Sequence, residues 1–404
     1  MHLTPRLVVE TIAALVTLSS LGFYVLSACG IASFLSAKRR GKSGNRENLP
    51  LPPVSILKPL KGIDPHLWEA FCSHCEQEYP EYELIFGVSD PLDPATELVR
   101  KLRDQYPHRR IEFLVCERDL GTNRKLSTLA QMLPAARHEM LLVNDSDIRV
   151  APDYLRRVIR PLADPAVGMV TCLYRGVAAP TLGSRLEALG ISTDFVPGVL
   201  SARVIEDGLH FGLGSTLAFR RSDLQAIGGF EGMVNYLADD YELGHRIATL
   251  GKRVELSEVV VETFLPPYSW RQFIDHQLRW ARSVRGARSW GYLGLSLTHG
   301  LPWALVTLLA ARGSLWAWWL LAATVAARLV VGLSSALAVL DDRPSLHDLY
   351  LLPIRDFLAP VVWALGLAGN RISWRGEVFY LAHGQLVRPD DPALQRELPH
   401  LPRP

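Results

Sequence analysis

Long uncharged stretches stand near both ends of the chain, and a mixed pattern fills its middle. Residues 11–35 form about 25 positions without a charge, enough to cross a hydrocarbon core about 30 Å thick. A cleaved signal peptide is the alternative, but its apolar region is shorter, about 7–15 residues, and follows a more basic start. The positive-inside rule places the basic residues that come next in the cytoplasm: Lys38, Arg39, Arg40, Lys42 and Arg46. We therefore predict an N-terminal transmembrane helix over 1–36 and a basic linker over 37–53.

Short apolar runs recur in the middle of the chain at intervals of roughly 30 residues, as expected for strands that alternate with helices. The runs occupy 54–58, 82–88, 111–116 and 139–143, and helical patterns lie between them at 93–106 and 125–133. This alternation predicts a Rossmann-like α/β domain over 54–265, with a mostly parallel sheet covered by helices. In such sheets, ligands bind beyond the carboxyl ends of the strands.

Apolar composition returns after residue 290, over 292–311, 314–340 and 349–369. The first two stretches have the length and composition of membrane segments. The third carries Arg355 and Asp356 near its middle, which are costly in lipid unless they pair or face protein. The pattern predicts two or three membrane segments over 291–370 and a C-terminal tail over 371–404. It leaves open the number of crossings and the side of the membrane on which the tail lies.

Bulk composition adds two exclusions. A net charge of +2 gives no reason to expect nucleic acid as a partner. Cys72-x-x-Cys75 is the only close pair among the five cysteines, and no second pair or histidine cluster completes a zinc site. We expect an ordinary reduced interior there, with no metal or redox role for the pair.

The strand predicted at 139–143 is followed by Asp145-Ser146-Asp147, so two carboxylates that repel each other stand at its end. A divalent cation removes this repulsion. Mg²⁺ or Mn²⁺ commonly takes one or two carboxylates together with phosphate oxygens, which predicts a diphosphate-bearing ligand at this place. The structural alternative is that Asp147 caps a helix near Pro152 or lies in a solvated turn.

Two further acidic positions stand beside predicted elements. Asp90 follows the strand at 82–88, where it is suited to accept a hydrogen bond from a uracil imide or, alternatively, to form a turn before Pro91. Asp239 and Asp240 open an amphipathic helix, whose dipole alone favours carboxylates there. Asp240 is also suited to remove a proton from an acceptor hydroxyl. A single base of this kind implies inversion at the anomeric carbon of a transferred sugar.

Residues 276–290 carry arginines at every third position, together with two tryptophans: Arg279, Arg282, Arg285, Arg288, Trp280 and Trp290. The stripe predicts an amphipathic segment over 266–290 at the membrane interface, with arginines at headgroups. Arg279 beside Trp280 is also suited to bind a diphosphate and to wall an acceptor pocket, because guanidinium pairs bidentately with phosphate.

Taken in order, these motifs resemble the ceramide glucosyltransferase family, whose pattern is three separated aspartate sites followed by (Gln/Arg)-x-x-Arg-Trp. The likeness covers about 50–290 and the flanking membrane segments, and it includes VSILKPLKGIDPHL, YPEYELIFGVSDPLDPA, NRKLSTL and LADDYELG. It implies a cytosolic GT-A glycosyltransferase domain with flanking transmembrane helices. The hopanoid-biosynthesis branch is the most similar, through MLPAARHEMLLVNDSDIRVAPDYLRRV, VGMVTCLYRG and HQLRWARSVR.

The resemblance also implies roles for particular residues. Those that would bind the nucleotide sugar are Pro59, Lys61, Asp90, Lys125 and Asp145. Asp145 and Asp147 would hold Mg or Mn, and Asp240 would be the catalytic base. Those that would close the site around the acceptor and the diphosphate are Asp239, His276, Arg279 and Trp280. His276 departs from the family's Gln or Arg and matches the hopanoid branch, while Asp147 often corresponds to glycine in ceramide enzymes.

Together these features predict an inverting enzyme that moves N-acetylglucosamine or glucose from UDP to a hydroxyl of a membrane lipid, with a hopanoid as the expected acceptor. The resemblance implies an integral membrane protein of a bacterial inner membrane, with its catalytic domain in the cytoplasm. Ceramide glucosyltransferase is one alternative, and a polyprenyl-phosphate or polysaccharide-type transferase is another, although processive synthases carry more membrane segments. A non-catalytic nucleotide-sugar-binding scaffold is the alternative of another class. It would tolerate loss of the base and of one metal ligand, and both are present.

Overall fold

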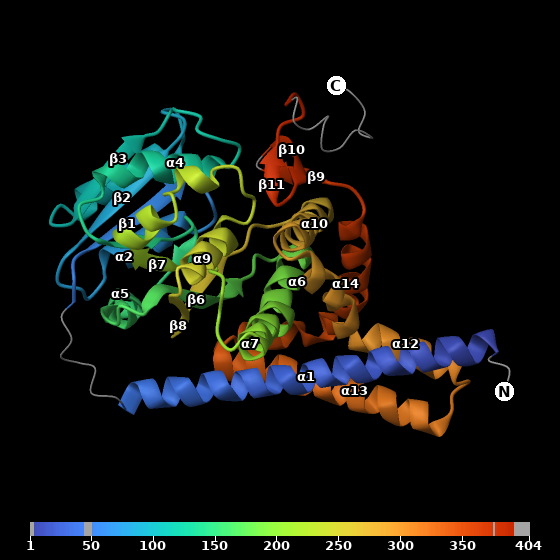
Figure 1. Cartoon of the computed structure of the whole chain (residues 1–404). Coiled ribbons are helices and arrows are strands. Elements are labelled where there is room, and N and C mark those ends of the chain that lie inside the picture. The colour runs from blue at the N-terminus through green and yellow to red at the C-terminus, as the bar shows by residue number, and fades with distance from the viewer. Residues whose placement is uncertain (1–3, 44–50, 375, 392–404) are drawn as a thin grey trace. The chain divides into compact units, whose positions relative to one another are not determined.

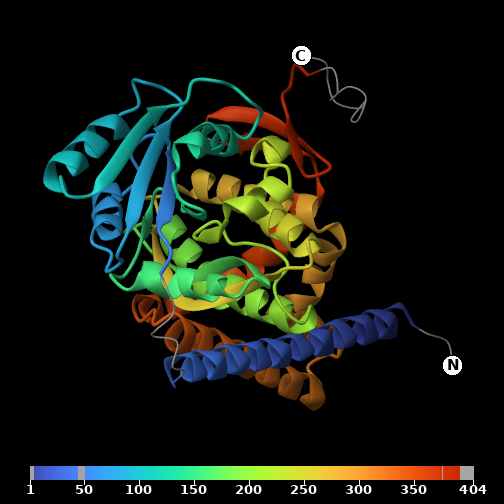
Figure 2. The same ribbon diagram turned by 60° about the vertical axis from the view of Figure 1, so that its left-hand side comes forward.

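The computed structural model describes residues 4–43, 51–374 and 376–391, and Figures 1 and 2 show it from two directions. Parts of the predicted linker, 37–53, and of the predicted tail, 371–404, lie outside the described residues. The chain divides into two compact units. We call them the helical unit (Met1–Lys42, Ala178–Asp207 and Pro267–Asn370) and the sheet unit (Ser43–Val177, Gly208–Pro266 and Arg371–Pro404).

The described part of the sheet unit contains an eight-stranded sheet in the order β3-β2-β1-β4-β7-β6-β8-β5. One half of it consists of β1 (Val54–Leu60), β2 (Tyr82–Val88), β3 (Arg110–Val115) and β4 (Met140–Val143). These strands run parallel, as the sequence pattern predicts (Figure 1). Buried side chains follow one another almost without interruption in β1 and β2, because helices cover both faces of a parallel sheet.

The other half of the sheet is mixed. It contains β5 (Ile148–Arg149), β6 (Val167–Val177), β7 (Leu217–Arg220) and β8 (Arg253–Phe264). β7 runs antiparallel to both β4 and β6, β8 runs parallel to β6, and β5 runs antiparallel to β8. The helices of this unit are α2 (Leu67–Cys75), α3 (Ala95–Gln105), α4 (Arg124–Met132), α5 (Tyr154–Ile159), α8 (Arg221–Ala226) and α9 (Asp239–Thr249).

A second sheet forms at the C-terminal end of the chain from β9 (Arg371–Trp374), β10 (Glu377–Ala382) and β11 (Gln385–Val387), all antiparallel. It belongs to the sheet unit. Its apolar core also contains a side chain from outside the segment, Leu237, which packs with Ile372, Phe379, Leu381 and Leu386. Much of the stretch expected to be a tail is therefore folded.

The helical unit holds α1 (Pro5–Ser43), α6 (Leu182–Gly190), the π-helical turn η3 (Ile191–Phe195), α7 (Val196–Ile205), α10 (Trp270–Ala287), α11 (Ser289–Gly294), α12 (Gly300–Ala310), α13 (Leu315–Leu333) and α14 (Leu352–Leu367). Four described helices are long and apolar enough to cross a membrane: Pro5–Arg40, Leu182–Ile205, Leu315–Val339 and Pro344–Leu367. A pair bent by 52°, Ser289–Thr298 with Gly300–Ala310, adds a fifth candidate. The sequence pattern gave no warning of the candidate at 182–205.

The charged pair in α14 has partners inside the helical unit. Arg328 of α13 donates to Asp356 at 2.8 Å and to Asp194 at 2.6 Å. Arg355 donates through Nε to Asp194 at 2.9 Å and through Nη1 to the Gln277 side chain at 2.6 Å. These charges therefore pair with protein groups, which is the condition under which such residues are tolerated in an apolar helix.

Candidate active site

The predicted site residues of the sheet unit begin at one edge of the parallel strands. The register pairs Leu57 with Val143 and Leu60 with Val88, so β1, β2 and β4 run level with one another. Their carboxyl ends meet at the same edge of the sheet, where ligands bind in open α/β folds. Pro59 and Lys61, Asp90, and Asp145 emerge there, from β1, β2 and β4 respectively.

The loop after β4 is held from beneath by buried polar groups. The side chain of Asn144 is fully buried and donates to the backbone oxygen of Ser215 at 2.7 Å. Lys58 of β1, also fully buried, donates through Nζ to the backbone oxygen of Asp145 at 3.1 Å. Burial lowers the pKa of Lys58 to about 7, although the carboxylates of Asp147 and Asp145 oppose the shift. The backbone of the loop is thus fixed while its two carboxylates project from it.

Asp145 and Asp147 meet different partners. Asp145 Oδ1 lies 2.8 Å from Lys125 Nζ, and the same ammonium lies 2.9 Å from Asp239 Oδ2. Asp147 accepts a hydrogen bond from the hydroxyl of Thr263 on β8. Burial raises the pKa of Asp147 to about 6, and the neighbouring charge of Asp145 adds to the rise. The two carboxylates therefore interact unfavourably here, as their sequence suggests.

Asp240 lies in the first turn of α9. Its Oδ2 accepts from the backbone N–H of Gly214 at 2.8 Å, and its Oδ1 accepts from the N–H of Tyr241 at 2.8 Å. Burial raises the pKa of Asp240 to about 6; the charge of Asp239 adds to the rise and that of Lys125 opposes it. A carboxylate with this pKa is a better proton acceptor than an ordinary one and is still ionised at neutral pH.

Gly214 marks the place where the second and third aspartate motifs converge. A Cβ at this glycine would lie 3.2 Å from Asp145 Oδ2 and 3.3 Å from Asp240 Oδ2, so both carboxylates border the same small space. Gly212 and Gly244 bring the neighbouring backbone close: a Cβ on Gly244 would lie 2.2 Å from the Gly212 nitrogen. The glycine-rich loop and α9 can approach this closely only without side chains.

A divalent cation at Asp145 and Asp147 would need hard oxygen ligands. No three or more His, Cys, Asp or Glu side chains form a ready-made metal site in the part of the chain that the structure describes. Mg²⁺ and Mn²⁺ do not need one, because they commonly combine one or two carboxylates with phosphate oxygens. The pKa of Asp147, raised in part by Asp145, reflects negative charge that a cation would neutralise. The donor set at 145 and 147 therefore fits such a cation.

The remaining predicted residues of the sheet unit lie at or near the surface. Pro59 is partly buried within β1, and Lys61 Nζ lies 3.9 Å from Glu377 of the C-terminal sheet. Asp90 is exposed, and its Oδ1 accepts from the backbone N–H of Leu92 at 2.9 Å, so it does form the turn that its sequence suggests. This turn leaves the carboxylate at the edge of the sheet.

His276, Arg279 and Trp280 belong to α10 in the helical unit. His276 Nδ1 lies 3.6 Å from a carboxylate oxygen of the buried Glu187, and the His276 ring lies 5.7 Å from the Trp280 ring. Trp280 also packs edge-to-face against Phe195 at 5.7 Å. The motif is therefore built into the packing of α10 against α6 and η3.

Two arginines further along α10 have partners within the helical unit. Arg285 donates to the backbone oxygen of Gly366 at 2.7 Å, and Arg282 donates to that of Ala368 at 3.2 Å. The last carbonyls of a helix have no partners within it and carry partial negative charge, so they attract cations. Arg282 and Arg285 therefore have partners at the C-terminal end of α14 that the sequence of α10 does not reveal.

The loop before Asp239 is tied to both α4 and the C-terminal sheet. Asn123, which caps α4, donates through Nδ2 to the oxygen of Tyr236 at 2.7 Å. Leu237 N donates to Gly384 O at 3.1 Å, and Leu386 N donates to Asn235 O at 2.7 Å, so the loop pairs with the β10–β11 hairpin like an added strand. The hydrogen bond from Asn123 connects the start of α4, which carries Lys125, to the loop before α9, which carries Asp239 and Asp240.

Two contacts of the site were missed at the sequence level. Thr263 contacts Asp147 from the end of β8, and no local signal marks it because the pairing joins distant segments. Glu187 has a signal, since it is a lone acid in the apolar stretch that forms α6. Buried acids are rare unless they are paired.

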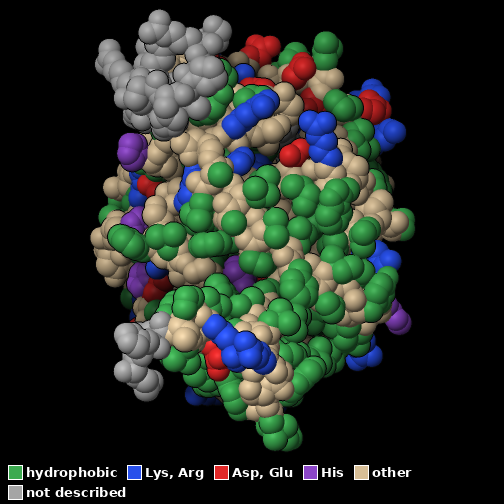
Figure 3. Space-filling model, turned by 90° about the vertical axis from the view of Figure 1, so that its right-hand side faces the viewer, with side chains coloured by type: hydrophobic (Ala, Val, Ile, Leu, Met, Phe, Trp, Pro, Cys, Tyr) green, Lys and Arg blue, Asp and Glu red, His purple; other side chains and the backbone are tan. Residues whose placement is uncertain are grey.

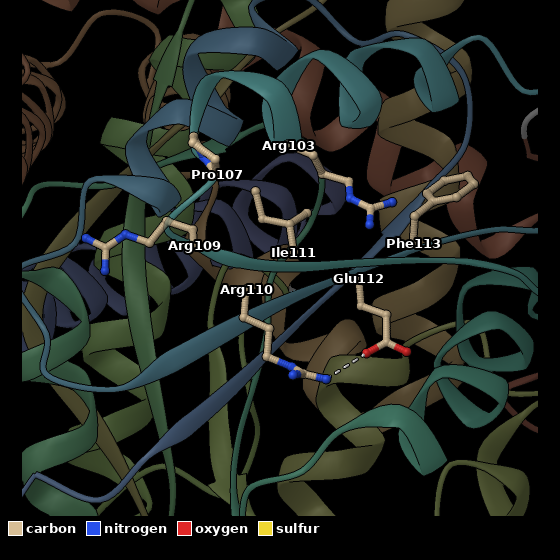
Figure 4. A pocket seen from close by; sticks show the side chains of 7 residues that line it. All are labelled: Arg103, Pro107, Arg109, Arg110, Ile111, Glu112 and Phe113. Atoms are coloured by element: carbon tan, nitrogen blue, oxygen red, sulfur yellow. Dashed lines mark ion pairs between the residues drawn. The ribbon is translucent and has the colours of Figure 1, made fainter.

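A cavity of about 580 Å³ lies elsewhere, at the amino-terminal end of the edge strand β3 (Figure 4). Its lining includes Arg109, which donates to the backbone oxygen of Cys75 at 2.8 Å, and Arg110, which pairs with Glu83 at 2.8 Å. The cavity is at the opposite end of the strands from the aspartates, and these two arginines have structural partners. It is not the site at which the predicted residues gather.

Comparison with known proteins identifies relatives along most of the chain. The profile of glycosyl transferase family 21 matches residues 20–387. Ceramide glucosyltransferase 3 of Caenorhabditis elegans is 24% identical over 363 residues, covering 85% of this chain and 76% of that protein. A ceramide glucosyltransferase of Komagataella phaffii is 32% identical over 129 residues, covering 30% of this chain and 25% of that protein. An N-acetylglucosaminyltransferase of Rhizobium leguminosarum bv. viciae is 24% identical over 251 residues, 59% of this chain and 57% of that protein.

A solved structure supports the fold. The mannosyltransferase PcManGT from Pyrobaculum calidifontis, in complex with GDP-Man and Mn²⁺, aligns with a TM-score of 0.50 and 21% identity, over 89% of this chain and 97% of that chain. The α/β fold with a mostly parallel sheet, similar to GT-A enzymes, is confirmed, as is the resemblance to the ceramide glucosyltransferase family. Because the family profile matches most of its length, the chain belongs to glycosyl transferase family 21 and is a glycosyltransferase.

Proposed function

We propose that this glycosyltransferase moves a sugar from a UDP-sugar to a hydroxyl of a membrane lipid with inversion at the anomeric carbon. The observation that carries the proposal is the convergence of the Asp145 and Asp240 carboxylates on the space at Gly214. A donor held by Asp145 then has its reacting carbon near a proton acceptor. Proximity of this kind converts a bimolecular step into an effectively intramolecular one.

On the donor side, Asp145 and Asp147 hold Mg²⁺ or Mn²⁺ together with the diphosphate. When bound, the cation supplies stabilisation of the negative charge on the leaving UDP. Lys125 adds a positive charge, since the carboxylates of Asp145 and Asp239 raise its pKa more than burial lowers it. Pro59, Lys61 and Asp90 border the uridine at the edge of the sheet.

On the acceptor side, Asp240 takes the proton from the attacking hydroxyl. The oxygen forms a bond to the anomeric carbon while the bond from that carbon to the UDP oxygen breaks. The N–H groups of Gly214 and Tyr241 hold the two oxygens of Asp240 in place, so the carboxylate meets the hydroxyl in one orientation. His276, Arg279 and Trp280 close the site around the lipid and the diphosphate, and Glu187 orients His276.

For the acceptor we propose a hopanoid alcohol and for the sugar N-acetylglucosamine. His276 in place of Gln or Arg supports the hopanoid branch, and one relative is named as an N-acetylglucosaminyltransferase. Several helices apolar enough to span a membrane favour a lipid acceptor. Ceramide is the second candidate, because five of the relatives are ceramide glucosyltransferases.

The acceptor and the sugar are tested together by mass spectrometry of lipids from cells with and without the gene. Purified protein with UDP-N-acetylglucosamine or UDP-glucose, and with a hopanoid alcohol or ceramide, gives the matching test in vitro. We expect an N-acetylhexosaminyl hopanoid only in cells with the gene. A hexosylceramide would overturn the acceptor assignment. UDP-sugar binding without a product from any lipid would favour the scaffold.

Removal of divalent cations is expected to lower turnover by about 100-fold, which corresponds to about 2.7 kcal/mol of lost transition-state stabilisation. Added Mn²⁺ or Mg²⁺ should restore it. The same titration, followed by calorimetric binding of UDP, should yield weaker UDP binding after EDTA treatment. Unchanged turnover and unchanged UDP affinity in EDTA would remove Asp145 and Asp147 from the metal role.

Leu237→Ala is expected to lower turnover roughly 10- to 100-fold, because small displacements of reacting groups have effects of this size. The side chain is 7% exposed in the core of the C-terminal sheet and precedes the Asp239–Asp240 pair. Leu250→Ala at the end of α9, where the side chain is 41% exposed, is the matched control. Initial rates and UDP binding are measured for both variants. Equal rates in the two variants would mean that the C-terminal sheet does not position the catalytic residues.

A further inference from the structure

We propose that the chain crosses the bilayer three times, through α1, the bent α11–α12 pair and α13. In this proposal the helix over 182–205 and α14 lie along the membrane surface, on the same side as the sheet unit. Length and composition alone allow more spans, since four helices and the bent pair all qualify. The order in which the chain passes between the two units limits how many of these helices can cross the membrane.

The helix over 182–205 belongs to a segment that leaves the large sheet and returns to the same sheet. The chain leaves at the end of β6 and returns before β7, and these two strands pair within that sheet, Val170 opposite Ala218. Both ends of this segment are therefore on the same side of the membrane. A segment that leaves and returns on one side crosses an even number of times. Because 182–205 is a single helical stretch, it crosses zero times.

The same rule applies to the segment 267–370. It starts after β8 of the large sheet and ends before β9 of the C-terminal sheet. Tyr236 and Gln385 form a bridge, and Thr122 Oγ1 donates to Leu386 O at 2.9 Å, so both ends belong to one folded unit. The number of crossings in this segment is even. Three candidates lie within it, so at least one of them does not cross.

α12 and α13 are the candidates that pair with α1. Arg6 Nε donates to Ala310 O at 2.7 Å, and Ser20 Oγ donates to Leu297 O at 2.6 Å, so the broken helix runs antiparallel along α1. α13 returns from the turn at 311–314, and Figure 1 shows both helices beside α1. Exposed tryptophans follow that turn, as expected at a membrane boundary: Trp316, Trp318 and Trp319.

α14 is the candidate that stays on the surface, because it lies along α10. Arg355 and Gly366 of α14 contact Gln277 and Arg285 of α10, so the two helices run side by side in the same direction. α10 carries too many charges to cross a hydrocarbon core. The exposed apolar side chains of α14 recur at spacings of three and four, a stripe suited to the acyl boundary: Ile354, Phe357, Val361 and Leu365. Figure 3 shows hydrophobic side chains spread over much of the face on which α14 lies.

The buried ion pairs agree with this arrangement. Arg328 is 13 residues beyond the start of α13, a rise of about 20 Å at 1.5 Å per residue. In a core about 30 Å thick, this places it beyond the middle, in the half away from the α12–α13 turn. Its partners Asp194 and Asp356 come from the two helices assigned to that surface. The charged side chains thus join the surface helices to a crossing helix near the boundary that they share.

Sidedness is tested by labelling introduced cysteines with a membrane-impermeant maleimide, in right-side-out and inverted vesicles that hold the full chain. Arg312→Cys lies in the α12–α13 turn, Arg343→Cys between α13 and α14, and Asp390→Cys after β11, and all three positions are exposed. Labelling of the protein with its native cysteines alone gives the baseline, and Cys29→Ser removes the exposed native cysteine. We expect Arg343→Cys and Asp390→Cys to react from one side and Arg312→Cys from the other.

Labelling of positions 343 and 390 from opposite sides would mean that α14 crosses the membrane. Labelling of positions 312 and 390 from the same side would mean that the α12–α13 hairpin does not cross the membrane. Ser314→Cys and Pro389→Cys give second reporters for the turn and the C-terminal end, in case one of the first variants does not fold. The readout does not involve sugar transfer, so it stands apart from the proposed function.

Discussion

Asp240→Asn is expected to lower turnover by about 10²- to 10⁴-fold, the range for loss of a general base. Asparagine keeps the shape of the side chain, and its oxygen can still accept from the Gly214 N–H, as Asp240 Oδ2 does at 2.8 Å. It cannot take the proton from an acceptor hydroxyl. UDP-sugar binding is expected to stay within a few-fold of the parent, because Asp145 and Lys125 are unchanged.

UDP release in the presence of lipid acceptor measures the first effect, and calorimetric binding of UDP measures the second. Asp153→Asn is the matched control, since Asp153 also stands at the start of a helix, α5. The control should keep the parental rate. If Asp240→Asn binds UDP normally and turns over as fast as the parent, Asp240 is not the base. If both binding and turnover are lost, thermal unfolding of the variant separates misfolding from a binding role.

The parallel half of the sheet was predictable because three of its four strands, β1, β2 and β4, are buried on both faces. β1, β2 and β4 appear in the sequence as short, mostly apolar runs, and their observed bounds differ from the predicted ones by two residues or fewer. The mixed half was not predicted. β7 has only four residues, Leu217–Arg220, and its place between β4 and β6 depends on pairing between distant segments. No local periodicity encodes that pairing.

The candidate site was also predictable only in the parts that local sequence marks. The aspartates at 145, 147 and 240 stand out in the sequence, because carboxylates at the ends of apolar strands and at helix starts need a reason. The two carboxylates that meet at Gly214 were linked only through the resemblance; their distance to that glycine is a property of the fold. The C-terminal sheet was missed for a similar reason, because its strands are short and they pair with a distant loop. The stretch from β9 to β11 was predicted to be a tail, and its apolar core includes Leu237 from outside the segment.

The arrangement of charges in the helical unit gives the second large prediction. Arg328→Met is expected to destabilise the protein by about 3–5 kcal/mol, the usual cost of removing one partner from a buried ionic group. The guanidinium side chain is 6% exposed, and its loss leaves Asp356 without the partner it contacts in the structure and Asp194 with Arg355 alone. Thermal unfolding of the purified protein in detergent, followed by intrinsic fluorescence, measures the loss as a lower midpoint.

A triple variant separates charge from packing. Arg328→Met combined with Asp194→Asn and Asp356→Asn removes the two carboxylates that paired with Arg328, while Arg355 keeps its hydrogen bond to Gln277 and can still donate to the amide oxygen at position 194. We expect this variant to recover part of the lost stability, because a buried charge without its partner is the main cost of breaking such a group. Arg312→Met, in the exposed α12–α13 turn, is the matched control and should change stability by no more than about 0.5 kcal/mol. A triple variant as unstable as Arg328→Met would mean that the arginine stabilises the helices by filling space, and that the charges of its partners matter little.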